Sequence, residues 1–398
     1  MILFEKHEWK LLWPFYAFQF LSGVFWVVMP FLVIYYRQRG LSFFEISVLW
    51  AVMSLAKVLF EVPTGIVADV FGRKFSAVSG YFLTSVFWII IPFTRNFAEL
   101  LFVIILISIS QTLISGALDA WVYDWLKFRK QQHLIKEYYV KFSMFGISGT
   151  IIGPFIGGIL AARVKLDWLF VVEGIGGVLA CVLLLFAHEH FRREKVLLVR
   201  QVRHAFSTAK KGFVFIKSQK QIQYFFIAGT GIAGWLAIDE LARQPFLNSL
   251  GMPVSYLGFF ASIVGFFTVI APFVGRWISR KFREKDIFIA AAAGTFFLLL
   301  LILIAAYPNY LVGAVIILLL DFIFFIQRPL FYAHQQHFIP SNTRATVLSA
   351  GSMLQELVYL IIILSGGYFM DVLGPQKVLV MSSIFMIPAV LAFMQFRR

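Results

Sequence analysis

Ten residues, 65–74, place charge beside glycine in a chain that is otherwise strongly apolar. They read Gly-Ile-Val-Ala-Asp-Val-Phe-Gly-Arg-Lys, and a long apolar segment lies on each side of them. Asp69 and Arg73 are four residues apart, a spacing at which opposite charges can meet on a helical turn. The decapeptide is too short to be a domain. It predicts charge held in a tight geometry between two helices at a membrane surface.

Other ionisable residues lie inside the apolar segments, where each is costly and is therefore a functional candidate. Asp321 and Glu356 are each about eleven or twelve residues from one end of their segment, which places them near the middle of the bilayer. In such a place a carboxylate can bind either a proton or a cationic solute. That exchange is sufficient to couple the movement of one to the movement of the other.

Two acids of the first half of the chain, Glu61 and Asp119, are expected about 10 Å above the inner ends of their helices. Lys57 lies four residues before Glu61, so this pair could instead be structural and neutralise itself. Asp239, near the outer end of its segment, fits a gate or a solvated rim. The aromatic candidates for contact with a solute are Trp121 and Trp235, because they share helices with these acids.

The composition requires a membrane around this chain. Of 398 residues, 60% are hydrophobic and 14% are charged, which is more apolar surface than a soluble protein can bury. The apolar runs are too long for barrel strands, so an all-α membrane protein with twelve transmembrane helices is expected. The predicted spans are 12–36, 43–68, 75–94, 98–126, 138–162, 167–187, 221–242, 254–278, 287–306, 309–333, 344–369 and 376–396.

Lys and Arg set the expected orientation. Most of the 35 basic residues fall in the loops and ends on the same side as the N-terminus, which predicts that both termini are cytoplasmic. This asymmetry also accounts for the net charge of +15 without nucleic-acid binding. The first apolar run is longer than that of a signal peptide and is expected to be retained. We therefore predict a multi-pass protein of the cytoplasmic (inner) membrane.

A polar stretch divides the twelve predicted spans into six and six. We expect an N-terminal bundle at 1–187, a cytoplasmic linker at 188–220 and a C-terminal bundle at 221–398. Apolar residues recur in the linker at spacings of three and four, from Val199 to Ile216, among basic residues. This pattern predicts a basic amphipathic helix on anionic lipid head groups. The alternative is a solvated helix that packs on the protein.

The pattern Gly-x-x-x-Asp-x-x-Gly-Arg-Lys between the second and third spans resembles the signature loop of the major facilitator superfamily. The resemblance covers the whole chain, with twelve spans, six plus six, and a long basic central loop. It implies two six-helix bundles that work by alternating access. It also implies a conformational latch on the cytoplasmic side, formed by Gly65, Asp69, Gly72, Arg73, Lys74 and Asp124.

A second motif lies in the fifth predicted span and comprises Gly149, Gly153, Pro154, Gly157 and Gly158. It resembles the glycine-proline motif of prokaryotic drug/proton antiporter-type exporters. Tight helix packing, which small residues on one face permit, is the alternative. The stretch from Ser108 to Ala117 contains no arginine, whereas many proton-coupled members carry one there. This departure puts the usual coupling arrangement in doubt and leaves the fold unaffected.

The leading hypothesis is a secondary active transporter that exports small amphipathic or cationic molecules in exchange for protons. A nutrient or metabolite importer on the same fold is the alternative, and a non-transporting membrane sensor or a membrane enzyme is a remote one. No nucleotide-binding, metal-ligating or catalytic motif is recognised, so we expect no enzyme activity, no catalytic residue, no metal and no cofactor besides the proton gradient. We expect a monomer in the lipid bilayer.

Overall fold

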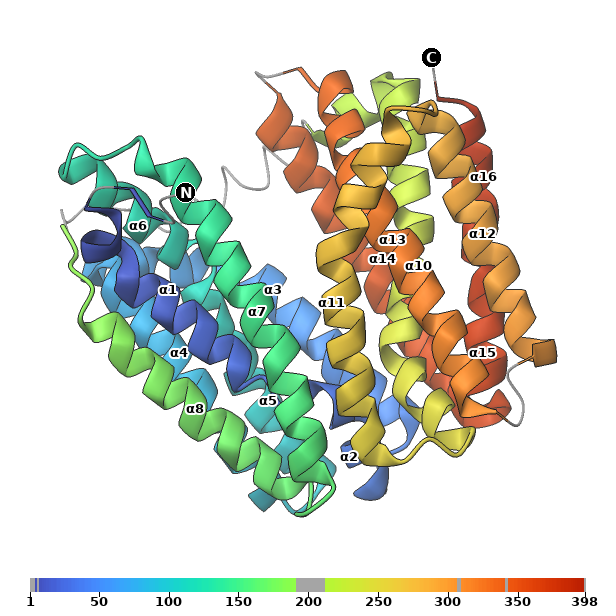
Figure 1. The fold of residues 1–398 in the computed structure, drawn as a ribbon, viewed down its shortest axis with the longest axis horizontal. Coiled ribbons are helices and arrows are strands. Elements are labelled where there is room, and N and C mark those ends of the chain that lie inside the picture. Colours follow the sequence, from blue (N-terminus) through green and yellow to red (C-terminus); the bar gives the residue numbers. More distant parts are fainter. Residues whose placement is uncertain (1–3, 6, 191–211, 306–308, 341–342, 397–398) are drawn as a thin grey trace. The chain divides into compact units, whose positions relative to one another are not determined.

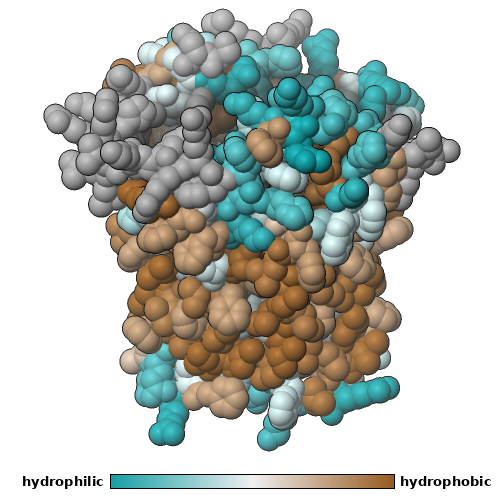
Figure 2. Space-filling model, turned by 90° about the vertical axis from the view of Figure 1, so that its left-hand side faces the viewer, coloured by the Kyte–Doolittle hydropathy of each residue, from teal (hydrophilic) through white to brown (hydrophobic). Residues whose placement is uncertain are grey.

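The structure is a computed structural model, which describes residues 4–5, 7–190, 212–305, 309–340 and 343–396. Throughout these residues the regular elements are helices. Within the described part of the chain, twelve helical segments are long and apolar enough to cross a membrane, and they follow the twelve predicted spans. On the face drawn in Figure 2, hydrophobic side chains form a band between two hydrophilic rims. The predicted all-α class with twelve spans is therefore confirmed.

The helices of the first half are numbered in chain order (Figure 1). Their bounds are α1 Glu8–Val24, η1 Met29–Phe31, α2 Leu32–Gln38, α3 Phe43–Phe71, α4 Arg73–Ile90, η2 Ile91–Phe93, α5 Phe97–Ile114, α6 Ala117–Phe128, α7 Leu134–Ala161 and α8 Asp167–Leu185. Those of the second half are α10 Lys220–Ser249, α11 Val254–Ser279, α12 Glu284–Ala305, α13 Tyr310–Phe338, α14 Arg344–Leu373, α15 Pro375–Met381, η3 Ser382–Phe385 and α16 Met386–Met394.

The chain forms two compact units. One contains residues 1–32 and 52–201, and the other contains 33–51 and 202–398. In the first unit, α1 packs between α7 and α8, while α4 packs on α5 and α8 (Figure 1). In the second, α10 packs on α14, α16 and α13, and α13 also packs on α11 and α12. The α2 helix and the start of α3 belong to the second unit by their contacts.

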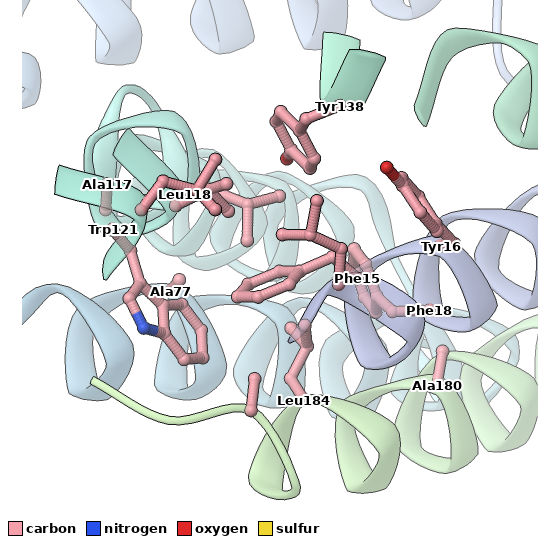
Figure 3. Packing of buried hydrophobic residues seen from close by; sticks show 14 of the residues in the cluster. Phe15, Tyr16, Phe18, Ala77, Ala117, Leu118, Trp121, Tyr138, Ala180 and Leu184 are labelled. Carbon is pink, nitrogen blue, oxygen red and sulfur yellow. The ribbon is translucent and has the colours of Figure 1, made fainter. Parts of the chain in front are cut away.

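Aromatic side chains fill the core of the first unit (Figure 3). The rings of Phe15 and Trp121 meet edge to face with centroids 4.9 Å apart. Tyr138 lies 6.3 Å from Phe15 in the same geometry, and all three residues are almost fully buried. Edge-to-face pairs add to the stabilisation that burial gives, by about 1 kcal/mol each. This cluster fixes α1, α6 and α7 to one another.

Three spans that the sequence predicted as continuous, 12–36, 98–126 and 376–396, are broken. The first is interrupted between Val24 and Met29, just before Pro30, which has no N–H to continue a helix. The fourth is interrupted at Gly116, whose φ of +71° suits a residue without a Cβ. A 3₁₀ turn, η3, divides the last.

Side chains of neighbouring helices use the carbonyl groups that the break in the fourth span leaves free. The Thr64 hydroxyl donates to the carbonyl of Thr112 over 3.1 Å, and the Ser76 hydroxyl donates to that of Leu113 over 2.7 Å. Since unpaired backbone groups are costly inside a membrane, these bonds stabilise the interrupted helix in its bent form.

Most of the predicted linker helix lies in residues 191–211, outside the described residues. Its end, 212–218, is helical. There Ile216 is buried in a cluster with Phe226, Val347 and Ala350. A Cβ on Gly212 would lie 2.5 Å from the Cβ of Ala350. The end of the linker thus packs on α10 and α14.

Candidate functional site

A buried cluster of three charges lies between α10 and α13, in the second unit. Asp239 and Arg243 are one helical turn apart on α10, and Asp321 comes from the middle of α13. Nη2 of Arg243 donates to Oδ2 of Asp239 and, over 2.6 Å, to Oδ1 of Asp321. One guanidinium nitrogen therefore serves two carboxylates. The side chains of Asp239 and Asp321 are 4% and 5% exposed, and that of Arg243 is 24% exposed.

Several polar atoms of this cluster are buried and make no hydrogen bond with the described residues. They are Oδ1 of Asp239, Oδ2 of Asp321 and Nε of Arg243. Nε1 of Trp235, one turn before Asp239 on α10, is also unpaired, and its ring meets that of Phe324 edge to face. With all three groups ionised, the cluster carries one excess negative charge in apolar surroundings. Such an arrangement favours uptake of one positive charge.

Glu240, beside the cluster, connects two further elements. Its Oε1 accepts the indole N–H of Trp50 from α3 over 2.8 Å, and its Oε2 accepts the hydroxyl of Tyr359 from α14 over 3.1 Å. Glu356 lies one turn before Tyr359 on α14 and is partly buried. Of the two acids predicted near the midplane, Asp321 therefore enters the charge cluster, while Glu356 lies on a different helix near Glu240 and Tyr359.

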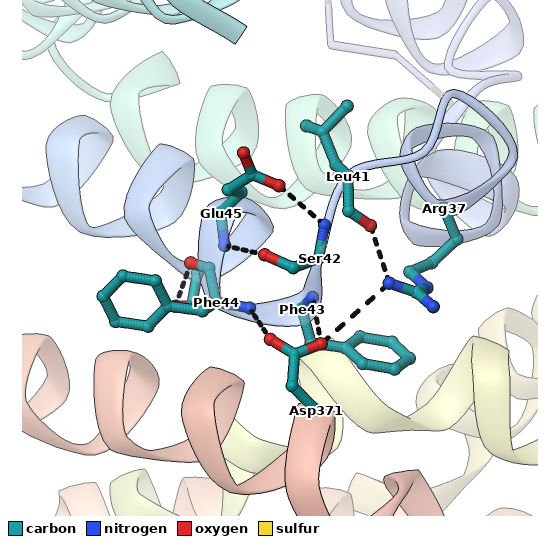
Figure 4. Close-up of polar contacts among 8 residues, drawn as sticks. Arg37, Leu41, Ser42, Phe43, Phe44, Glu45 and Asp371 are labelled. Carbon is teal, nitrogen blue, oxygen red and sulfur yellow. Dashed lines mark hydrogen bonds and ion pairs between the residues drawn. The ribbon is translucent and has the colours of Figure 1, made fainter.

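The N-terminus of α3 is held by a carboxylate from α14 (Figure 4). Oδ1 and Oδ2 of Asp371 accept the N–H groups of Phe43 and Phe44, each over 2.8 Å. Ser42, directly before α3, forms a capping box with Glu45, with bonds of 3.0 and 2.7 Å between side chains and backbone. Together these contacts satisfy the N–H groups that begin the helix.

Arg37 completes this contact. Its Nη1 donates to the carbonyl of Leu41 over 2.7 Å and lies 4.0 Å from Oδ1 of Asp371. The guanidinium carbon is 4.3 Å from the centroid of the Phe43 ring (Figure 4). Arg37 and Asp371 are partly exposed, so the ion pair itself contributes little. Hydrogen bonds from Asp371 to the α3 backbone are the stronger part of the contact.

The signature turn in the first unit brings together two of the predicted latch residues. Nη1 of Arg73 donates to Oδ2 of Asp124 and, over 2.7 Å, to the carbonyl of Ala120. Asp69 makes no hydrogen bond or ion pair with the described residues. Gly65 has open space among the described residues where a Cβ would lie, so no close helix approach depends on this glycine there. Gly72 adopts a φ of +107° and makes the turn.

An acid outside the motif completes the turn. Oε1 of Glu189 accepts the N–H of Lys74 over 2.9 Å, at the start of α4. The Lys74 ammonium donates to the carbonyls of Leu185 and Ala187 over 2.8 and 2.7 Å. Trp121 donates its indole N–H to the carbonyl of His188 over 2.9 Å. Trp121 therefore serves this packing and the core of Figure 3. Sequence reasoning assigned Glu189 to the linker and missed its role.

The glycines of the second motif lie on the face of α7 that meets the broken first span. A Cβ on Gly149 would lie 2.8 Å from Cα of Gly23, and a Cβ on Gly153 would lie 2.5 Å from the carbonyl oxygen of Gly23. On Gly157 it would lie 2.5 Å from the carbonyl oxygen of Val27. The motif therefore permits direct backbone contact between α7 and the first span. Pro154 and Gly158 are buried on the same helix.

Three further candidates lie apart from these clusters. Lys57 and Glu61 are exposed and form no ion pair with each other among the described residues, so the self-neutralising pair is absent. Asp119 is exposed in the first turn of α6, directly after the break at Gly116. Among the described residues, no group of three or more His, Cys, Asp and Glu side chains could hold a metal ion.

Sequence reasoning missed two buried acids. Glu8 is fully buried at the start of α1. Its Oε2 lies 2.6 Å from Nζ of Lys141, and its Oε1 accepts the Tyr16 hydroxyl over 2.8 Å. Glu173, in α8, accepts the N–H of Val28 over 2.8 Å. An acid beside glycines at 174, 176 and 177, within an apolar span, was the signal for Glu173.

Comparisons with known proteins agree with this architecture. The model of the Major Facilitator Superfamily matches residues 15–362. A Bacillus subtilis (strain 168) protein, the uncharacterized MFS-type transporter YxaM, is 27% identical over 267 residues, which are 64% of this chain and 63% of that protein. The match thus spans less than two thirds of this relative's length.

Two solved structures share the fold across nearly the whole chain. A mutant form of the nucleoside transporter NupG superposes with a TM-score of 0.78 at 13% identity, over 97% of this chain and 99% of that one. A D-xylose–proton symporter superposes with a TM-score of 0.67 at 14% identity, over 97% of each chain. At these identities the likeness shows the fold alone.

Proposed function

Since the chain belongs to the Major Facilitator Superfamily of membrane transporters, we propose that it is a secondary active transporter that exports small amphipathic or cationic molecules in exchange for protons. The observation that carries this proposal is the cluster of Asp239, Arg243 and Asp321, in which two buried carboxylates share one guanidinium nitrogen. The cluster has one excess negative charge that either a proton or a cationic solute can compensate, so the two compete for it.

The proposed exchange proceeds in steps that the cluster's residues supply. A proton on Asp321 removes the excess charge and leaves Arg243 paired with Asp239. A cationic solute near the unpaired Oδ2 of Asp321 favours release of this proton, because a nearby positive charge stabilises the ionised carboxylate. The indole N–H of Trp235 and the ring of Phe324 offer a polar and an aromatic contact to an amphipathic solute.

We propose that two contacts described above change during alternating access. On the cytoplasmic side, the bond between Arg73 and Asp124 acts as a latch that must open. In the second unit, Asp371 holds the start of α3 through two backbone N–H groups. Each contact stabilises the conformation in which it forms, and so shifts the equilibrium between conformations without taking part in a chemical step. The glycine face of α7, which resembles the exporter motif, would let the first span move against it.

The remaining assignments belong to the same proposal. The protein acts as a monomer in the cytoplasmic (inner) membrane, with both termini and the linker at 188–220 on the cytoplasmic side. It uses the transmembrane proton gradient and no cofactor. Asp321 is the leading proton site, with Asp239 beside it, and the exposed acids Glu61 and Asp119 are secondary.

A second candidate function is uptake of a neutral solute together with protons. Two structural neighbours, a nucleoside transporter and a D-xylose–proton symporter, favour testing it. In that function the cluster would bind a proton without competition from the solute. The direction of proton movement relative to solute movement therefore separates the two candidates.

Proteoliposomes test both candidates in one design. The probes are tetraphenylphosphonium, as a lipophilic cation, and radiolabelled uridine and D-xylose, as neutral solutes. Export by exchange predicts that a proton gradient drives the cation in the opposite direction to the protons, and that Asp321→Asn removes this flux. Asp286→Asn, an exposed acid in the first turn of α12, is the control and leaves it unchanged. Flux of uridine or D-xylose in the same direction as protons, with no cation flux, favours uptake instead.

A further inference from the structure

The break in the first span lies between two helices that enclose it. On one side, Gly157 of α7 approaches the carbonyl of Val27 within the break, and Gly149 and Gly153 approach the backbone at the end of α1. On the other side, α8 passes so closely that a Cβ on Gly176 would lie 1.8 Å from the ring of Phe25. Water therefore cannot readily act as the hydrogen-bond partner of the backbone groups of residues 25–28, which form the break. Their N–H groups need acceptors within the protein.

The N–H groups of Phe25, Trp26 and Val27 donate to the backbone carbonyls of Leu21, Gly23 and Phe25. The N–H of Val28 has its acceptor in Glu173 of α8. Its Oε2 accepts the N–H of Val28 over 2.8 Å, and the carboxylate also accepts the N–H of Val27. Glu173 is 8% exposed. Its interactions with the described residues are these two backbone groups, and no cation or other titratable side chain of α1, α4, α7 or α8 is among them. The helix facing it on the remaining side, α4, presents Ser85 and Ile89 to the glycines at 174 and 177.

Two opposing effects act on this carboxylate. A buried charge without a cation is costly, which favours the protonated form. Charge-assisted hydrogen bonds from two N–H groups favour the ionised form. Protonation adds an O–H donor to the carboxyl group and removes its charge, so its oxygens accept hydrogen bonds from N–H groups more weakly. A proton on Glu173 therefore weakens the hydrogen bond that holds the N–H of Val28 and loosens a constraint on the angle between α1 and η1.

We propose that Glu173 is a second proton-binding site and that its protonation changes the bend in the first span. The inference extends the proposed proton coupling, because it gives the second proton site a mechanical output in the first unit. The site is separate from the cluster of Asp239, Arg243 and Asp321, which lies in the second unit. Discontinuous helices at ion sites are a recurrent feature of transporters.

Two measurements on the full chain in lipid nanodiscs test this inference without any substrate. The first is the infrared band of protonated carboxylic acid that forms on acidification. We expect Glu173→Gln to remove part of this band, and Glu99→Gln, an exposed acid in the first turn of α5, to leave that part intact. The second is the ¹⁹F resonance of fluorotryptophan at Trp26, which lies in the break and is 42% exposed. Its assignment follows from Trp26→Phe.

In the wild-type protein the Trp26 resonance is expected to shift with pH in step with the infrared band, and in Glu173→Gln it is expected to stay fixed. A wild-type Trp26 resonance that does not respond to pH overturns the inference, even if Glu173→Gln fails to fold. An infrared band equal in wild type and Glu173→Gln overturns it too. Absence of transport in proteoliposomes, with both spectroscopic signals present, instead contradicts the proposed function and leaves this inference standing.

Discussion

Asp371 accepts the backbone N–H of Phe43 over 2.8 Å, although 328 residues separate the two in the chain. The second oxygen of the same carboxylate accepts the N–H of Phe44 over 2.8 Å. A carboxylate that bridges two N–H groups at the start of a helix is stabilised by both hydrogen bonds and by the helix dipole. This contact ties α14 to α3 through the backbone, so it does not depend on the side chains of Phe43 and Phe44.

Asp371→Asn should weaken this contact. The amide keeps one acceptor oxygen and loses the charge, and its NH₂ group faces an N–H donor, so we expect a loss of about 1–3 kcal/mol. The measurement is the apparent melting temperature in detergent, which should fall. Asp286→Asn, an exposed acid in the first turn of its own helix α12, should leave it unchanged. Equal melting temperatures for Asp371→Asn and wild type would show that the contact does not stabilise the protein.

Gly153→Ala and Gly65→Ala form a matched pair of helix substitutions with opposite expected results. A Cβ on Gly153 would lie 2.5 Å from the carbonyl oxygen of Gly23, whereas Gly65 has open space. Gly153→Ala should force α7 away from the first span and destabilise the protein by about 1–3 kcal/mol. Gly65→Ala should be neutral or stabilise α3 by up to about 1 kcal/mol. Thermal unfolding measures both, and similar effects of the two substitutions would refute the packing argument.

The signature turn makes a prediction that separates its two aspartates. Asp124→Asn removes the acceptor of Arg73, so it should shift the distribution of distances between spin labels placed on the two six-helix halves. Asp69→Asn should leave that distribution near wild type, because Asp69 has no partner among the described residues. Both side chains of the Arg73–Asp124 pair are partly exposed, and a shift of less than about 1 kcal/mol is expected.

A stronger response to Asp69→Asn than to Asp124→Asn would contradict this reading of the turn. It would mean that Asp69 acts in a conformation other than the one described. Lys74→Ala is a useful companion, because Lys74 holds the carbonyls of Leu185 and Ala187 and makes no contact with Asp124. The effect of Lys74→Ala on the same distance distribution therefore measures the packing of the turn independently of the bond between Arg73 and Asp124.

Features that depend on neighbouring residues in the chain could be predicted from the sequence alone. Span number and helical class follow from the length and apolarity of each segment. The pairing of Arg73 with Asp124 was implied by the family resemblance, and Gly149, Gly153 and Gly157 follow from a spacing of four on one helix face. The fold class is confirmed, while the functional roles of these residues stay predictions.

The other contacts depend on which segments meet in space, and a single sequence does not contain that information. In the sequence Asp371 is an ordinary acid near a helix end, and its role is evident only from its contact with the start of α3. Glu189 reads as part of a polar linker until its carboxylate reaches the N–H of Lys74. The breaks in the first and fourth spans did have signals, at Pro30 and at Ser115-Gly116. Because the apolar run continues through each break, each span was predicted as one continuous helix.

The central claim is that a proton and a cationic solute compete for one excess charge on Asp239, Arg243 and Asp321. The most direct test is to add tetraphenylphosphonium to the purified protein in weakly buffered detergent and to follow the pH with a dye while calorimetry follows binding. The account predicts that the wild-type protein releases protons as it binds the cation, and that Asp321→Asn releases none. Cation binding without proton release, or equal release from Asp321→Asn, would contradict it.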